Sequence, residues 1–318
     1  MSELGFEVIT VAGQGTADRI VPGLGIGDAE HAVTPDPSVL GDALRDADLV
    51  VVENLCTIPL NLSASRAVAA ELAGRPAILH HHDPPWHRER FTHITELPST
   101  DPAWQHVAIT RHAAVELADR AKIEAVVIHN GFPAPLLGDR IAQRSALGVA
   151  DDELLLAHPV RAIERKNIGA AIDMTESMGA TYWLLGDAEE GYGPALDDLL
   201  GRASCRVVRQ PCTVTADIYG AADGVVFPST WEGFGNPPIE AALHHRPVAV
   251  GHYPFADELR TLGFGFVEPN DALAMSRRIQ HPDLDELQRN HELALEHFGL
   301  DRVRHQLRTL LERAGWMP

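Results

Sequence analysis

The chain has 318 residues, 45% of them hydrophobic, and carries a formal net charge of −19 from 45 acidic and 26 basic side chains. This length suits about two domains of roughly 150 residues, and the composition excludes global disorder. The acidic balance disfavours a nucleic-acid partner or a broad surface for anionic membranes, since both require clustered lysine and arginine.

Short apolar runs alternate with amphipathic stretches in the first half, which is typical of βα units around a parallel sheet. The predicted strands are Glu7–Val11, Asp48–Val52, Ala77–His81, His106–Thr110 and Glu124–Ile128, and the predicted helices are Ser38–Ala47, Ser63–Leu72 and His112–Ala121. The strands are apolar without clean alternation, so we expect helices to cover both faces of the sheet.

The second half repeats this pattern. Its predicted strands are Leu154–His158, Tyr182–Leu185, Cys205–Val208, Gly224–Pro228 and Val248–Gly251, with helices at Ile168–Met178, Ala195–Arg202, Ala216–Ala222 and Pro238–His244. Asn-Gly and two prolines in the segment 129–135 mark a boundary. We therefore predict two doubly wound, Rossmann-like α/β domains facing a cleft, residues 1–134 and 135–318. The last stretch, 283–314, is predicted as two helices that could pack back on the first domain.

Cysteine usage and the absence of targeting patterns bear on the compartment. Cys56, Cys205 and Cys212 have no zinc-ligand spacing and fit a reducing environment. The N-terminal segment does not resemble a signal peptide, and no apolar run approaches the ~20 residues that span a bilayer. We expect a cytoplasmic protein without stable membrane insertion; its oligomeric state is not indicated by the sequence.

The segment 227–242 combines a strand end, a glycine-rich loop and the start of a helix. Gly233 and Gly235 allow a ligand to approach the backbone closely, and a helix N-terminus offers N–H groups to anionic oxygens. Glu232 and Glu240, with seven residues between them, can face the same cleft and accept hydrogen bonds from sugar hydroxyls. The structural alternative is an ordinary turn with solvated glutamates.

A basic turn follows the first strand of the second half, within residues 158–172. Arg161 and Lys166 lie after the strand, and Lys166 and Asn167 open a helix. Two cations beside a helix N-terminus suit a diphosphate, because arginine binds it as a fork and lysine as a point charge. The alternative is a solvated basic turn that includes Arg165.

Together these residues resemble the donor half of retaining glycosyltransferases of the GT-B fold, specifically glycosyltransferase family 4. The resemblance rests on Arg161, Lys166 and the spacing of Glu232 and Glu240, and extends to the segments 127–133 and 219–229. It spans roughly residues 5 to 300 and is strongest from 155 to 270. It implies a nucleotide-diphospho sugar as co-substrate, with no other cofactor and no metal.

The resemblance also implies residue roles. Arg161 and Lys166 would neutralise the departing diphosphate, and Glu232 would hold hydroxyls of the transferred sugar. Backbone N–H groups around the donor loop and two further side chains would complete the substrate-binding set: Phe234, Gly235, Asn236, Glu240 for the ribose, and Asn167 in a supporting role.

The segment 79–91 places three consecutive histidines at a strand end. In an extended chain His80 and His82 share one face and His81 takes the other, so the three cannot all converge on one ion, and we expect no metal. Buried, hydrogen-bonded histidines are the structural alternative. The resemblance implies a catalytic role for His82 near the donor sugar, with His81 as a second candidate.

The N-terminal segment departs from the family pattern. It matches the end of the family's first helix and its second strand, so the N-terminal domain is expected to lack the first strand and helix. Either the chain starts further upstream or its acceptor site is reduced. After the last predicted strand, Tyr253 and Pro254 are bulkier than the small residues of the family.

The resulting prediction is a metal-independent, retaining glycosyltransferase that moves a hexose from a nucleotide-diphospho sugar to a hydroxyl of a small molecule or glycan. The alternatives are a non-catalytic nucleotide-sugar-binding protein with an incomplete acceptor domain, and a sugar-nucleotide epimerase or phosphorylase on the same fold.

Overall fold

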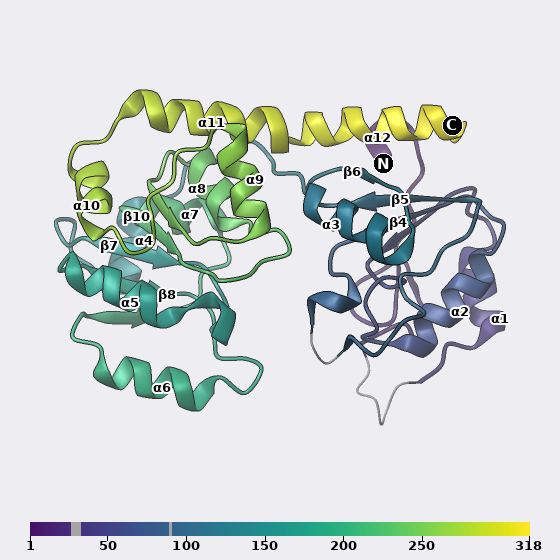
Figure 1. The fold of residues 1–318 in the computed structure, drawn as a ribbon, viewed down its shortest axis with the longest axis horizontal. Coiled ribbons are helices and arrows are strands. Elements are labelled where there is room, and N and C mark those ends of the chain that lie inside the picture. Colours follow the sequence, from purple (N-terminus) through teal and green to yellow (C-terminus); the bar gives the residue numbers. More distant parts are fainter. Residues whose placement is uncertain (27–32, 89–90) are drawn as a thin grey trace. The chain divides into compact units, whose positions relative to one another are not determined.

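The computed structural model describes residues 1–26, 33–88 and 91–318, and the chain divides into two compact units (Figure 1). Unit 1 comprises Met1–Asn130 and Asp301–Pro318, and unit 2 comprises Gly131–Leu300. The division falls within the predicted turn-rich segment, slightly before residue 134. The last helix, α12 (Leu300–Ala314), is assigned to unit 1 from Asp301 onward instead of to the second domain.

Unit 2 is built on a parallel sheet with strand order β11-β10-β7-β8-β9. Its strands are β7 (Leu155–His158), β8 (Thr181–Leu184), β9 (Val207–Arg209), β10 (Gly224–Phe227) and β11 (Val248–Val250). The chain winds outward from β7 in one direction and then returns to form β10 on the other side. The switch point therefore lies between β7 and β10, and ligands of such sheets bind at the carboxyl ends of the strands there.

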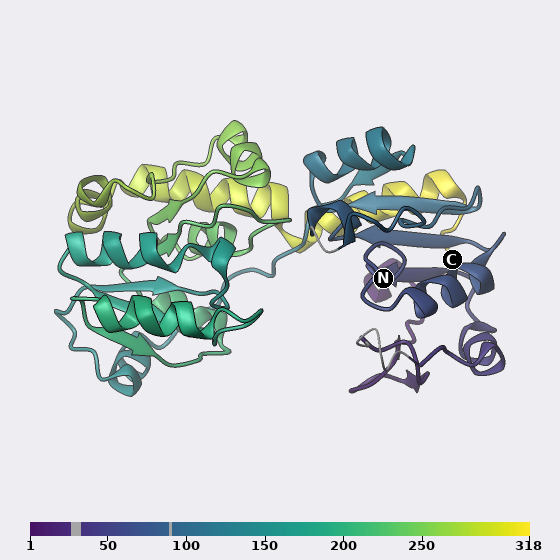
Figure 2. The same cartoon turned by 60° about the horizontal axis from the view of Figure 1, so that its bottom comes forward.

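Helices pack around this sheet, as Figure 2 shows. They are α4 (Arg140–Leu147), α5 (Ile168–Ser177), α6 (Gly193–Arg202), α7 (Thr215–Ala221), α8 (Pro237–Leu243), α9 (Pro254–Leu262), α10 (Ala272–Gln280) and α11 (Leu284–Phe298). Every residue of β7, β8 and β10 is buried, as expected for a parallel sheet covered on both faces.

Unit 1 contains a parallel sheet with strand order β3-β4-β5-β6. Its strands are β3 (Val50–Glu53), β4 (Ala77–His81), β5 (Trp104–Ala108) and β6 (Ala125–Val127). Besides α12, its α-helices within the described residues are α1 (Pro37–Leu44), α2 (Leu62–Leu72) and α3 (Arg111–Glu116). The register places Glu53 of β3 opposite His80 of β4. Leu310 and Leu311 of α12 are buried in one cluster with apolar side chains of this sheet.

The predicted strand Glu7–Val11 is wrong. Of these residues only Val11 belongs to a strand, β1 (Val11–Ala12), which pairs with β2 (Arg19–Ile20) in a separate parallel ladder. The Asp18 carboxylate accepts hydrogen bonds from the Thr10 N–H and hydroxyl at 2.8 and 2.7 Å. This pairing forms a two-stranded sheet separate from the main sheet of unit 1, and Val8 is 47% exposed.

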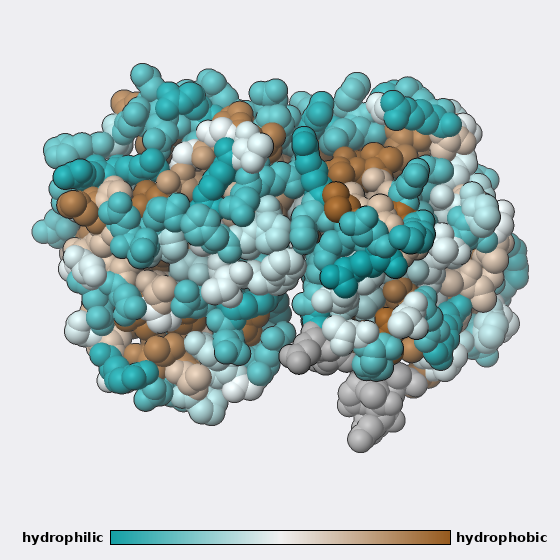
Figure 3. Space-filling view, in the orientation of Figure 1, coloured by the Kyte–Doolittle hydropathy of each residue, from teal (hydrophilic) through white to brown (hydrophobic). Residues whose placement is uncertain are grey.

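The surface is mainly hydrophilic in the view of Figure 3, in keeping with the net charge of −19. Within the described ranges, no helix is both long enough and apolar enough to cross a membrane.

Candidate active site

Two loops of unit 2 meet at the switch point of its sheet. One follows β7 and ends at Asn167, and the other follows β10 and ends at the start of α8. The Thr230 N–H donates to the Arg165 carbonyl at 2.9 Å, and the Asn167 amide donates to the Pro228 carbonyl at 3.4 Å. These two contacts, one between backbone groups and one from the Asn167 side chain, fix the basic turn beside the glutamate loop.

Glu232 lies between two cations at this junction. Its Oε1 accepts from the Lys166 ammonium at 2.5 Å, and its Oε2 accepts from the Arg165 guanidinium at 2.6 Å. Arg165 also donates to the Trp231 carbonyl at 2.8 Å. Lys166 and Glu232 are only 8% and 6% exposed, so their pairing is a charge-assisted contact largely shielded from water.

Neighbouring groups act in opposite directions on the pKa of Lys166. Burial lowers the pKa of its ammonium, the Glu232 carboxylate raises it, and Arg165 and Arg161 lower it again. The ammonium also lies 5.2 Å from the centroid of the Phe227 ring, at cation–π distance. Two cations thus contact one buried carboxylate, and this excess positive charge suits an additional anion.

Arg161 stands slightly apart from this contact. Its guanidinium forms an ion pair with Glu189 at 2.7 Å, and its side chain is 55% exposed. Exposed ion pairs contribute little to stability, so an anion could draw Arg161 away from Glu189 at small cost. Arg161 was predicted from the sequence to bind the diphosphate, and Arg165 appeared there only as part of a solvated basic turn, whereas Arg165 is the arginine that contacts Glu232.

Glu240 lies in the first turn of α8 and forms a hydrogen bond with Tyr219 of α7. The Tyr219 hydroxyl donates to its Oε2 at 2.7 Å. Burial raises the pKa of Glu240, and the hydrogen bond from Tyr219 opposes this increase. A half-buried carboxylate with one oxygen tied to the protein can accept hydroxyl groups at its remaining lone pairs.

The loop between the two glutamates is shaped by Gly235, whose φ is +86°. A Cβ atom there would lie 2.7 Å from the Tyr253 hydroxyl, so both the backbone angle and the lack of space require glycine. The adjacent Phe234 is buried and stacks on Phe255 with ring centroids 4.1 Å apart. Asn236 is exposed at the N-cap of α8.

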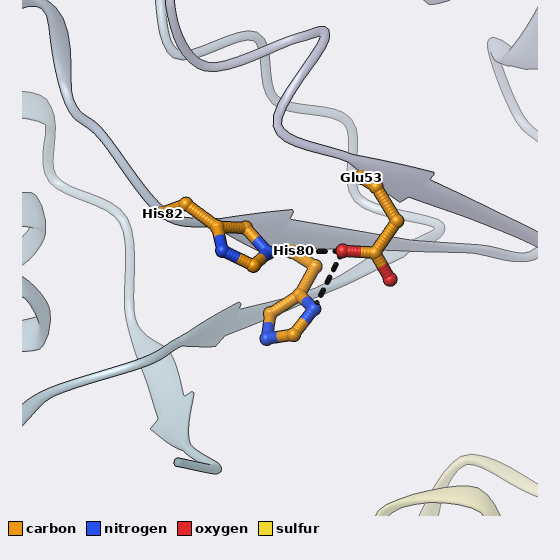
Figure 4. Close-up of side chains that lie close together, drawn as sticks. All are labelled: Glu53, His80 and His82. Atoms are coloured by element: carbon orange, nitrogen blue, oxygen red, sulfur yellow. Dashed lines mark hydrogen bonds and ion pairs between the residues drawn. The ribbon is translucent and has the colours of Figure 1, made fainter. Parts of the chain in front are cut away.

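His80 and His81 end β4, His82 follows it, and their side chains alternate as predicted. His80 and His82 face the same side and both contact Glu53 Oε2, at 2.8 and 3.0 Å (Figure 4). His81 faces the other side, fully buried, and contacts His106 at 2.9 Å. Burial would raise the pKa of Glu53, but the two histidine hydrogen bonds outweigh it and lower this pKa to about 2.

The structure therefore brings together Lys166, Asn167 and the glutamate loop. The contacts of Arg165 and Tyr219 were not foreseen; the only sequence signals were the adjacency of Arg165 to Lys166 and the position of Tyr219 shortly before β10. The chemical roles assigned to the predicted residues, including His82 in unit 1, stay predictions.

Comparison with known proteins adds independent information. No protein-family model matches the chain. The mannosylglucosylglycerate synthase of Thermotoga maritima is 26% identical, over 83% of this chain and 76% of that protein. The synthase of the same name from Petrotoga mobilis is 25% identical, and the chain covers 64% of its length, slightly under two thirds.

Solved structures share the fold. Anabaena HepE in complex with UDP and glucose aligns over 87% of this chain and 81% of its own, with a TM-score of 0.72 and 21% identity. Sucrose-phosphate synthase from Thermosynechococcus elongatus aligns over 87% and 76%, with a TM-score of 0.66 and 16% identity. The chain accordingly has the GT-B fold, with two Rossmann-like α/β units.

The chain is a glycosyltransferase, because its sequence relatives and the residues of its donor loop agree on this class. Glycosyltransferase family 4 is the family that it resembles.

Proposed function

We propose that the protein transfers a hexose from a nucleotide-diphospho sugar to a hydroxyl acceptor with retention of configuration and without a metal ion. The observation that carries the proposal is the contact of Lys166 and Arg165 with Glu232 at the switch point of the unit 2 sheet. It combines cations for a diphosphate and a carboxylate for sugar hydroxyls in one place.

The two kinds of group can act at the same time. An ammonium has three N–H donors and a guanidinium has five, while a carboxylate has about four lone-pair positions. The contacts among Lys166, Arg165 and Glu232 use only some of these. The cations can therefore bind phosphate oxygens while Glu232 accepts hydroxyl groups of the sugar.

Such a site favours departure of the diphosphate. Cleavage of the bond to the anomeric carbon leaves an oxocarbenium-like sugar and places negative charge on the leaving phosphate. Cations positioned in advance, with little water around them, stabilise charge that develops in the transition state. Lys166, which is buried, meets this requirement most directly, and the same positive charge removes the need for a metal at the diphosphate.

The comparisons guide the choice of donor and acceptor. HepE was solved with UDP-glucose, and the relatives are named as synthases of mannosylglucosylglycerate. We infer glucosyl or mannosyl nucleotides as donors and a small hydroxylated molecule, such as glucosylglycerate, as the acceptor. Glu240, held by Tyr219, is the residue that we assign to the ribose.

Calorimetric titration with UDP, GDP and ADP and their hexose conjugates in the presence of EDTA tests the donor site. We expect one nucleotide to bind, Glu240→Gln to weaken it, and Glu124→Gln, an exposed control in unit 1, to leave it unchanged. Absence of binding to every donor would overturn the proposal.

Transfer is then measured with the donor that binds, using glucosylglycerate and related acceptors. Product with the anomeric configuration of the donor, formed in EDTA, supports the proposal. Binding of the donor without transfer or donor hydrolysis would instead indicate a nucleotide-sugar-binding protein.

A further inference from the structure

The ends of β3 and β4 bring three groups with metal-ligand chemistry together in unit 1. The strands are parallel neighbours, and their register sets Glu53 opposite His80. Because side chains alternate along a strand, His82 reaches the same face as His80. One ligand atom from each of Glu53, His80 and His82 lies within 4.8 Å of the other two (Figure 4).

We propose that Glu53, His80 and His82 form a binding site for a divalent transition-metal ion of the zinc type. The proposal concerns a group of side chains separate from the donor loops of unit 2, and it does not depend on the proposed sugar transfer.

The distances are close to those that a metal requires. Zinc binds imidazole nitrogen and carboxylate oxygen at about 2.0–2.2 Å, which sets tetrahedral ligands roughly 3.3 Å apart. Glu53 Oε2 already lies 2.8 Å from His80 Nδ1 and 3.0 Å from His82 Nε2. Shifts of a few tenths of an ångström in these side chains would make room for the ion. The ion would take the place of the two protons that lie between Glu53 and the histidines.

The donor set also indicates which ion would bind. Two imidazoles and one carboxylate suit zinc, cobalt, nickel or copper, whereas magnesium and calcium prefer all-oxygen sites. Three protein ligands leave a fourth position for water, as in open zinc sites. The side chains of Glu53, His82 and His80 are 61%, 31% and 20% exposed, so a hydrated ion can reach them from solvent.

A second group in unit 1, formed by His87, His112 and Glu116, also satisfies the ligand spacing. There, however, the carboxylate of Glu116 forms an ion pair with Arg120 at 3.5 Å, and this cation would repel a metal ion. The ion pairs recorded for Glu53 over the described part of the chain involve only the two histidines. The structure therefore favours the Glu53 group over the Glu116 group.

The test uses the full chain, stripped of metal with EDTA and then freed of the chelator. Cobalt(II) is titrated while its visible absorption is recorded, because that absorption reports the number of ligands around the ion. Zinc is then added as a competitor, and magnesium serves as the negative control. We expect one cobalt ion per chain, displaced by zinc and not by magnesium.

Variants locate the site. Glu53→Gln and His80→Gln should each weaken metal binding at least about tenfold, because loss of a group that only supports a ligand already has an effect of this size. His112→Gln should leave metal binding unchanged. Glu53→Gln changes no volume at an exposed strand end, so this variant is expected to fold even if His80→Gln does not. Thermal unfolding of each variant checks this.

The proposal is overturned if wild-type protein binds no cobalt. It is equally overturned if Glu53→Gln binds as tightly as wild type, or if His112→Gln is the variant that loses the ion. Since no nucleotide sugar is present, these outcomes are distinct from a failure of the proposed transfer.

Discussion

Lys166 is the side chain through which the donor site is most directly tested. It is buried, its ammonium contacts Glu232, and Arg165 supports the same carboxylate from the other oxygen. Removing the ammonium leaves Glu232 still paired with Arg165, so the change should affect chemistry more than folding.

We predict that Lys166→Met lowers the rate of transfer by about 10²- to 10³-fold, the range seen when a positioned group that stabilises charge is removed. Initial rates at saturating donor and acceptor measure this. Arg161→Met is the matched control, because Arg161 is exposed and bonded to Glu189, and its effect should be smaller. Unchanged turnover in Lys166→Met would remove this residue from the mechanism.

The hydrogen bond from Tyr219 opposes the effect of burial on the pKa of Glu240. Burial raises the pKa of Glu240, and the Tyr219 hydrogen bond lowers it. Tyr219→Phe should therefore raise this pKa further. Only the ionised carboxylate accepts hydroxyl groups with both oxygens. As the solution is acidified, donor affinity should therefore begin to fall at a higher pH in Tyr219→Phe than in wild type. Titrations of the donor over a pH series check the shift; superimposable profiles would contradict it.

At this scale the sequence was informative where a residue type and its spacing carry the chemistry. Lys166 and Glu232 were selected from the sequence, and the structure places them in direct contact. Arg165 and Tyr219 were missed because their contacts depend on how two loops or two helices approach each other. Residue types alone do not determine such approaches.

Among the elements, β4 and β5 share a buried polar contact that should make unit 1 sensitive to acid. His81 Nε2 and His106 Nδ1 lie 2.9 Å apart, and the Thr57 hydroxyl contacts the other nitrogen of His81 at 2.8 Å. Burial lowers the pKa of His81 from 6.5 to about 3 and that of His106 from 6.5 to about 4.

These shifts fix the sign of the pH dependence. The folded-state pKa values lie below the unfolded values, so the unfolded chain binds more protons below pH 6.5. Stability should fall as the pH drops from 6.5 towards 4 and below. His106→Asn keeps a polar group at Nδ1 but removes one titrating ring, so its unfolding midpoint should depend less steeply on pH over this range. An equal or steeper slope would exclude the pair as a cause.

Most βα units could be predicted because continuous apolar runs and helix caps are local signals. The predicted strand Ala77–His81 matches β4 at both ends, and the predicted helices in 283–314 appear as α11 and α12. The helix α4 was not predicted. Its inward-facing side includes Arg144, which is fully buried and donates to the Ala221 carbonyl at 2.9 Å, so the usual apolar stripe is interrupted.

The segment Glu7–Val11 was predicted as a strand but does not form one. Its residues favour a strand, but a strand needs a partner, and the carboxylate of Asp18 binds Thr10 instead. Likewise, the metal-ligand arrangement at His80 and His82 depends on Glu53, which a parallel register brings from a neighbouring strand. The sequence indicates that the histidines share a face, but it does not contain this register.

At the scale of the whole molecule, the chain ends in the unit where it begins. Residues Asp301–Pro318 group with Met1–Asn130, and Leu310 and Leu311 lie in one cluster with Ile78 of β4. The final helix therefore completes the core of unit 1, and its contribution to stability should appear there and not in unit 2.

We predict that Leu311→Ala lowers the free energy of unfolding of unit 1 by about 2–5 kcal/mol, because Leu311 is fully buried and its loss leaves a cavity. Leu300→Ala, on the same helix but 48% exposed, should change stability by less than about 0.5 kcal/mol. Hydrogen exchange resolved by peptide separates the units: protection should fall in β4 and β5 and persist in β7 and β10. The units are measured separately because a two-domain chain need not unfold in one step. A loss of protection confined to unit 2 would show that α12 does not stabilise unit 1 through this core, and so would equal losses in both variants.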